Sequence, residues 1–119
     1  MTQTARHMNG DMQQCIQECL TCHSVCLATV QYSMQMDPQR GAAQYMPMLL
    51  DCSEICQTSA NFMLRGSTLH TRTCGICAEI CTRCAEVCEH MGNDSQMTLC
   101  AKECRHCADA CRQMATMEA

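Results

Sequence analysis

Cysteine, where most chains would have leucine or valine, occupies the regularly spaced apolar positions of this sequence. Within each of four segments these positions recur every three or four residues, and short polar stretches rich in glycine, proline, asparagine or aspartate separate the segments. Residues three and four apart lie on one face of an α-helix, so each segment predicts a helix with one apolar stripe. The predicted helices span about 11–35, 43–65, 68–91 and 95–117.

The breaks between the predicted helices carry residues that end or begin helices. Gly66 fits the position just beyond the end of the second helix, and Ser67 can cap the third. Asp94 or Ser95 can cap the fourth helix. Pro47 is tolerable only if it lies in the first turn of the second helix, where its missing N–H is not needed.

The four stripes predict one architecture. Short connections make consecutive helices antiparallel neighbours, and four stripes that face a common axis form a bundle. Aromatic residues make up only 3% of the chain, too few for a sheet, and 119 residues leave room for one domain. We therefore predict an all-α fold, an antiparallel up-down-up-down four-helix bundle with a cysteine-lined core, in which residues 1–119 form a single domain.

Sulfur supplies most of the apolar content of this core. Leu, Ile, Val and Phe together account for only 15 of the 119 residues, below the roughly 20% at which a chain usually fails to build a core. Yet the hydrophobic fraction is 47%, because 15 Cys and 12 Met make up the difference. Either the chain is a disordered metal binder or sulfur fills its interior, and the helical spacing favours the second.

Charge and composition exclude several classes of function. A net charge of -4 argues against nucleic acid and anionic membranes as partners. No apolar stretch approaches the about 20 residues needed to span a bilayer. The first residues lack the apolar run of a secretory signal, so we expect a cytoplasmic protein. No nucleophile–base arrangement or phosphate-binding loop emerges, and we expect no enzymatic activity.

The cysteines have three explanations: disulfides, simple packing, or metal binding. An odd number of cysteines on long helices disfavours a disulfide framework. Packing alone explains them poorly, because fifteen small thiols bury less apolar area than valine or isoleucine would. Metal binding explains both their number and their alignment. The candidate ligands are Cys15, Cys19, Cys22, Cys26, Cys52, Cys56, Cys74, Cys77, Cys81, Cys84, Cys88, Cys100, Cys104, Cys107 and Cys111.

Charge and softness decide between metals. Iron–sulfur motifs place their cysteines on loops, often before proline, which this chain does not do. Isolated four-thiolate zinc sites each carry a charge of about -2, and several in a dry bundle would be costly. Cu(I) is soft and needs few ligands, and one Cu(I) per bridging thiolate gives a neutral core. Multiple Cu(I) ions per chain are therefore favoured. A zinc or soft-metal buffer and a redox-active thiol protein remain the alternatives.

The spacing C-x-x-x-C-x-x-C-x-x-x-C, seen as CIQECLTCHSVC and CAKECRHCADAC, resembles the copper storage proteins, as does CGICAEICTRCAEVC in the third helix. The resemblance covers about Cys15 to Met114. It implies storage of Cu(I) on core thiolates in a homotetramer of the cytosolic branch, with copper ions and a copper donor or acceptor as partners. The second helix departs from the pattern, because it holds only the isolated pair Cys52 and Cys56 on a stripe that continues through Met48.

Methionine and histidine gather toward both ends of the predicted bundle. The resemblance implies that copper is admitted where the first helix ends. The positions of the residues on their own stripes slightly favour the opposite end, and methionine is also ordinary core filling. Candidate ligands where the first helix ends are Met48, His90, Met91 and Met97, and those at the opposite end are Met8, Met63, His70 and Met114.

Overall fold

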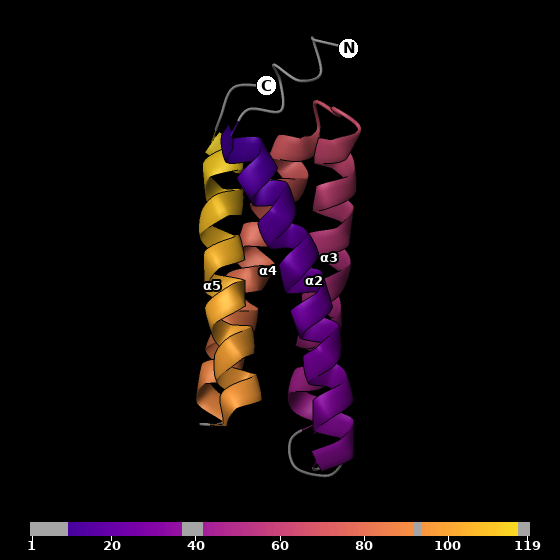
Figure 1. The fold of residues 1–119 in the computed structure, drawn as a ribbon, viewed down its shortest axis with the longest axis vertical. Coiled ribbons are helices and arrows are strands. Elements are labelled where there is room, and N and C mark those ends of the chain that lie inside the picture. The colour runs from indigo at the N-terminus through magenta and orange to yellow at the C-terminus, as the bar shows by residue number, and fades with distance from the viewer. Residues whose placement is uncertain (1–9, 37–41, 92–93, 117–119) are drawn as a thin grey trace.

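The computed structural model describes residues 10–36, 42–91 and 94–116, with side chains of the second range described from residue 45. It confirms the predicted fold class, an all-α antiparallel bundle with a cysteine-lined core (Figure 1). The helices are α2 (Gly10–Met36), α3 (Ala42–Leu64), α4 (His70–Met91) and α5 (Ser95–Thr116). Assignment of the whole chain to one domain stays a prediction.

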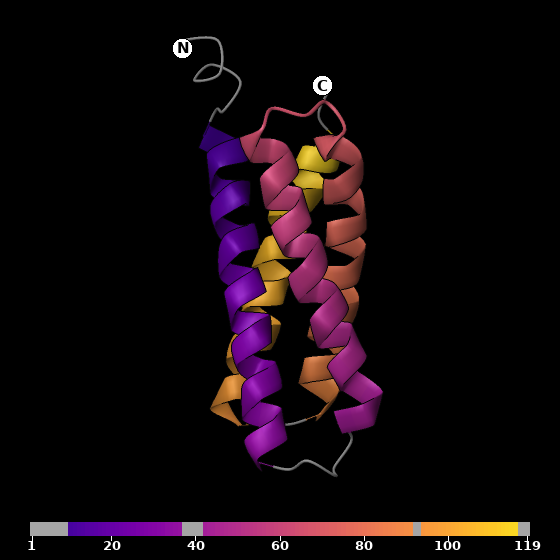
Figure 2. The ribbon, with the colours of Figure 1, turned by 90° about the vertical axis from the view of Figure 1, so that its right-hand side faces the viewer.

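Each helix packs against its two neighbours around a common axis. α2 contacts α3 and α5, and α4 contacts the same two helices (Figure 2). We call the end where α2 begins, α5 finishes and residues 65–69 join α3 to α4 the turn end (Figure 1). The opposite end, where α2 and α4 finish, is the pocket end. None of the described helices is both long and apolar enough to cross a membrane.

The turn after α3 has the geometry that glycine permits. Gly66 has a φ of 72°, in the left-handed region that side chains with a Cβ rarely adopt. The Gly66 N–H donates to the Met63 carbonyl over 3.1 Å, and the Ser67 N–H donates to the Phe62 carbonyl over 2.9 Å. These two bonds satisfy carbonyls that the helix end leaves open. The predicted role of Gly66 is confirmed.

Side-chain caps begin the last two helices. The Leu69 N–H donates to Ser67 Oγ over 3.1 Å, and α4 begins at His70, two residues later than predicted, because residues 68 and 69 belong to the turn. Asp94 caps α5, since the Met97 N–H donates to Asp94 Oδ1 over 2.9 Å. Of the two predicted caps for α5, Asp94 therefore makes this bond.

Two expectations for α3 are wrong. Pro47 lies inside the helix and beyond its first turn, because the helix begins at Ala42. One hydrogen bond to a carbonyl four residues earlier is lost there, and the helix continues. The core stripe passes through Leu49, which is fully buried, whereas Met48 is only partly buried. The true helical phase thus places Met48 beside the core face.

Candidate metal centre

All fifteen cysteines lie in the core, each with 0% of its surface exposed, and all are free thiols. The three- and four-residue spacing turns every one of them toward the bundle axis, as helical geometry requires. α4 supplies the longest cysteine stripe and α3 the shortest. A core of this kind is polar in chemistry but dry in environment, so an ion inside it interacts with sulfur and not with water.

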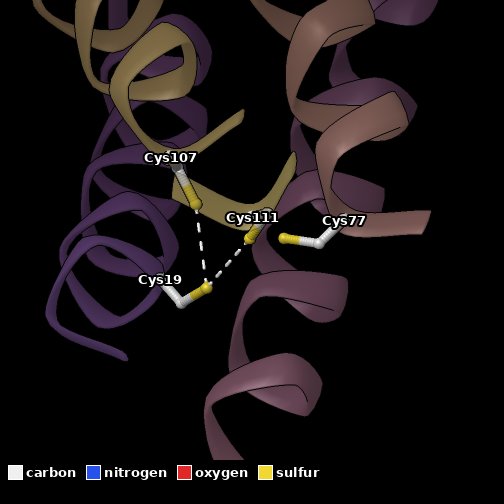
Figure 3. Close-up of side chains that lie close together, drawn as sticks. All are labelled: Cys19, Cys77, Cys107 and Cys111. Atoms are coloured by element: carbon white, nitrogen blue, oxygen red, sulfur yellow. Dashed lines mark hydrogen bonds between the residues drawn. The ribbon is translucent and has the colours of Figure 1, made fainter. Parts of the chain in front are cut away.

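Thiols from different helices meet at close range. Cys19 Sγ lies 3.5 Å from Cys111 Sγ and 3.8 Å from Cys107 Sγ, with Cys77 pointing into the same space (Figure 3). If each of two such sulfurs lay about 2.3 Å from a shared metal, the length of a zinc–thiolate bond, the S–metal–S angle would be roughly 100–110°. That angle suits tetrahedral or near-trigonal coordination. Pairs of thiols are therefore spaced to share a metal without movement of the backbone.

Larger groups form by overlap of these pairs. Several sets of four cysteines have all their Sγ atoms within 4.8 Å of one another. Ordered from the pocket end to the turn end, five of these quartets are Cys26/Cys84/Cys100/Cys104, Cys22/Cys26/Cys52/Cys104, Cys22/Cys52/Cys56/Cys81, Cys56/Cys77/Cys81/Cys107 and Cys19/Cys77/Cys107/Cys111. Each quartet shares two cysteines with the next. We call these five overlapping quartets the thiol ladder.

Cys52 and Cys56 are adjacent to many thiols in space although they form an isolated pair on α3. One or both of them occur in three of the five quartets of the thiol ladder. Cys52 Sγ lies 3.6 Å from Cys81 Sγ, and Cys56 Sγ lies 3.8 Å from Cys107 Sγ. The pair is not spatially isolated, because its partners come from the other three helices.

Hydrogen bonds between thiols lower the pKa of some core cysteines and raise the pKa of others. Hydrogen bonding with neighbouring thiols, Cys104 first, lowers the pKa of Cys22 and of Cys52. Hydrogen bonding with Cys100 is the first cause that raises the pKa of Cys26 and of Cys88, and burial adds to the rise. A thiolate is stabilised by S–H donors that must themselves keep their protons. Conversion of the whole core to thiolates therefore requires an incoming positive charge.

The pocket end brings together part of the predicted ligand set. A pocket of about 250 Å³ opens there, and both Met91 and Met97 line it. Its other lining residues are Tyr32, Ser33, Met36, Tyr45 and Asp94. His90 is exposed and shares a neighbouring pocket with Met91, whereas Met48 lines neither of these two pockets.

The turn end holds the other predicted ligands in a drier setting. Met63 and Met114 have 0% and 1% of their surfaces exposed, and His70 is buried. Cys74 Sγ lies 3.8 Å from Met63 Sδ, with the thiol as donor. His70 Nδ1 lies 2.8 Å from a backbone carbonyl oxygen, so the Nδ1 proton is used there. Met8 lies outside the described residues.

Three polar groups in or beside the core had little or no signal in the sequence. The Ser59 hydroxyl is fully buried with no hydrogen-bond partner among the described residues; only its place on the α3 stripe indicates it. Burial, and then the neighbouring Glu18 carboxyl, raise the pKa of Glu103 to about 9. Ser53 Oγ lies 2.9 Å from His23 Nδ1 and ties α3 to α2. Both of these contacts join different helices, which residue spacing along one helix does not reveal.

Comparison with known families gives one assignment. The model of a family described as "Copper storage protein" matches residues 8–116 of this chain. Among curated proteins, none matches.

Solved structures of similar fold agree with that match. The Nmul_A1745 protein of Nitrosospira multiformis is 39% identical, with a TM-score of 0.83 over 91% of this chain and 97% of that one. Cu(I)-bound copper storage protein BsCsp3 is 26% identical, with a TM-score of 0.83 over 89% of this chain and 99% of that one. Apo copper storage protein 3 of Bacillus subtilis is 27% identical, with a TM-score of 0.81 over 87% and 98% of the two chains.

Proposed function

Because the chain belongs to the copper storage protein family, we propose that it stores Cu(I) in the cytoplasm, with all fifteen core cysteines as ligands. The observation that carries this proposal is the thiol ladder, whose quartets overlap along the bundle axis. Overlap makes most of these thiols neighbours of more than one metal position. A ligand shared between two ions is a bridging thiolate, which is the arrangement that a store of many ions requires.

Charge balance determines which metal this arrangement suits. As each Cu(I)–S bond forms, the thiol releases its proton and copper keeps its oxidation state. One Cu(I) per thiolate leaves the core neutral, which a dry interior favours. Fifteen thiolates would supply at most three separate four-thiolate zinc sites, each with a charge of about -2. The same core therefore accommodates many more Cu(I) ions than Zn(II) ions.

We propose that copper is admitted at the pocket end. The support is the pocket itself, with the half-buried Met91 and the buried Met97 on its wall. The proposal includes Met48 and His90 as further transient ligands; His90 directly precedes Met91 and shares a neighbouring pocket with it. A thioether is neutral and soft, so it can take up Cu(I) and release it to a thiolate. Each step along the thiol ladder then retains two shared cysteines while two others exchange.

The proposal extends to compartment and assembly. Fifteen free thiols persist in a reducing compartment, which supports the cytoplasm. The proposal also includes the homotetramer that the resemblance to the family implies. The chain acts by binding and release of copper, with a donor and an acceptor for the metal, and performs no catalysis.

The test is an anaerobic titration of the reduced, metal-free protein with Cu(I) and with Zn(II), with thiols counted before and after. We expect a break near 15 Cu(I) per chain, the number of cysteines, and far fewer Zn(II), which copper displaces. A break at about four Cu(I) or fewer would contradict a bridged core. Equal loading by zinc would indicate a general soft-metal buffer. Reversible loss of thiols without metal would indicate a redox protein instead.

A further inference from the structure

The turn end contains a sulfur contact that lies outside the thiol ladder. Cys74 Sγ is 3.8 Å from Met63 Sδ, and both side chains are fully buried. Cys15 Sγ is 3.6 Å from Cys111 Sγ. The Cys15 and Cys74 thiols are neighbours of each other. Two thiols and one thioether that the five quartets leave out therefore gather beside the last quartet.

α3 changes its donor atom along the core stripe. Cys52 and Cys56 contribute thiols, Ser59 follows with a fully buried hydroxyl, and Met63 ends the stripe with a thioether. A hydroxyl oxygen is a hard ligand that does not suit Cu(I), whereas a thioether sulfur is soft. α3 therefore offers a copper ligand again only at Met63, level with Cys74.

We propose that Cys15, Cys74 and Met63 form a terminal Cu(I) site of two thiolates and one thioether, distinct in chemistry from the thiol ladder. The inference rests on the proposed function and adds a ligand of another kind to it. When copper binds, the two thiols release their protons, Met63 donates a lone pair, and the metal stays Cu(I). The thioether brings no charge, so the site carries about -1, where three thiolates would give about -2.

The atoms that meet in the contact between Cys74 and Met63 distinguish this site from ordinary packing of a methionine in the core. The sulfur of Met63, and not only its methyl group, lies within hydrogen-bonding distance of the Cys74 thiol. Met114 is buried at the same end, yet among the described residues no thiol hydrogen bond reaches it. Because Cys111 contacts Cys15 and also belongs to the last quartet, copper can pass between the ladder and this site. A thioether binds Cu(I) more weakly than a thiolate, so Met63 sets how tightly the terminal ion is held.

The experiment compares Met63→Leu with Met114→Leu, which are matched in burial, in end of the bundle and in change of volume. Each variant is loaded with Cu(I) under anaerobic conditions and then challenged with a graded Cu(I) chelator. We expect Met63→Leu to hold one Cu(I) fewer per chain, or to release one at a chelator concentration at least tenfold lower. Met114→Leu should match the parent protein. Met63→Cys should retain that ion at least tenfold more tightly than the parent.

A second readout does not depend on folding of the variants. In the parent protein labelled with ¹³C at the methionine methyl groups, the Met63 resonance should shift as the last equivalents of Cu(I) bind, and the Met114 resonance should move far less. An unmoved Met63 resonance in a fully loaded core would overturn the terminal site and leave the proposed function intact. Equal capacity and retention in folded Met63→Leu would do the same. Failure of the parent protein to load many ions would instead contradict the proposed function.

Discussion

The two ends of the bundle carry the same soft residue type in opposite settings. At the pocket end, Met91 is half-buried and lines a cavity of about 250 Å³ together with Met97. At the turn end, Met63 and Met114 are fully buried. A thioether that water can reach exchanges its partner readily, whereas one sealed in the core is fixed in place. Exposure, more than residue type, therefore distinguishes uptake from retention.

Polar groups sharpen the contrast between the ends. The Ser33 hydroxyl at the pocket end is buried without a hydrogen-bond partner among the described residues, and it lines the pocket. The phenol of Tyr32 donates to Asp94 Oδ2 over 2.9 Å at the rim. Oxygen atoms thus surround the methionines at this end, whereas sulfur is the donor next to Met63. The wall of the pocket is therefore partly polar, whereas the donor next to Met63 is a thiol.

Truncation of methionines should show the largest difference between the ends. Met114→Ala leaves a cavity in a sealed region and should destabilise the reduced, metal-free protein by about 2–5 kcal/mol. Met91→Ala should cost less than about 1 kcal/mol, because part of that side chain is already in water. Urea denaturation followed by circular dichroism measures both. Equal losses would show that the pocket end is packed as tightly as the turn end.

Copper uptake, in contrast to stability, should depend more on the pocket end than on the turn end. Leucine at both Met91 and Met97 preserves volume and removes the sulfurs at the pocket, and should slow Cu(I) uptake about tenfold, or ~1.4 kcal/mol in the barrier, with capacity nearly unchanged. Stopped-flow transfer of copper from a chelator measures the rate.

Two further variants complete this comparison. Met114→Leu, at the opposite end, should leave uptake unchanged. Met48→Leu should slow uptake less than the double variant, because Met48 lines neither pocket at the pocket end. Slower uptake in Met114→Leu, with no change on loss of Met91 and Met97, would place admission at the turn end.

Replacement of cysteines in the middle of the core, between the two ends, should have a smaller effect, which is a change in the total copper capacity. Serine at both Cys52 and Cys56 alters three of the five quartets, whereas serine at both Cys84 and Cys88 alters one. We expect the first pair to lose more than two Cu(I) per chain and the second pair no more than two, as measured by metal analysis after loading. Losses equal to the number of cysteines removed in both variants would mean that the sites bind independently.

Much of the fold was predictable because the same spacing of cysteines recurs on every helix. Cysteines three and four residues apart specify the buried face, and they account for the confirmed bundle. Gly66 and Asp94 were predictable as helix boundaries because their conformational and capping preferences are local. The phase of α3 was predicted less well, since Met48 and Leu49 are both apolar neighbours and only packing against other helices selects Leu49.

The candidate site was predictable in composition but not in connectivity. Which thiol approaches which depends on the rotation and axial offset of four helices, and spacing along one helix contains neither quantity. Cys19 and Cys111, 3.5 Å apart, are 92 residues apart in sequence. The contact between Cys74 and Met63 depends likewise on the turn that sets α4 against α3. That the fifteen cysteines, Met63, and the methionines and histidine named at the pocket end bind copper stays a prediction.

The overlap of the quartets also has a statistical consequence. In a partly filled core of shared sites, the same number of ions can be distributed in many ways, and this multiplicity adds configurational entropy to binding. It is largest near half filling and vanishes when every position is occupied. Successive ions would therefore bind with gradually falling affinity, each tenfold step equal to about 1.4 kcal/mol. Such a core would fill gradually over a wide range of free copper concentrations instead of saturating abruptly.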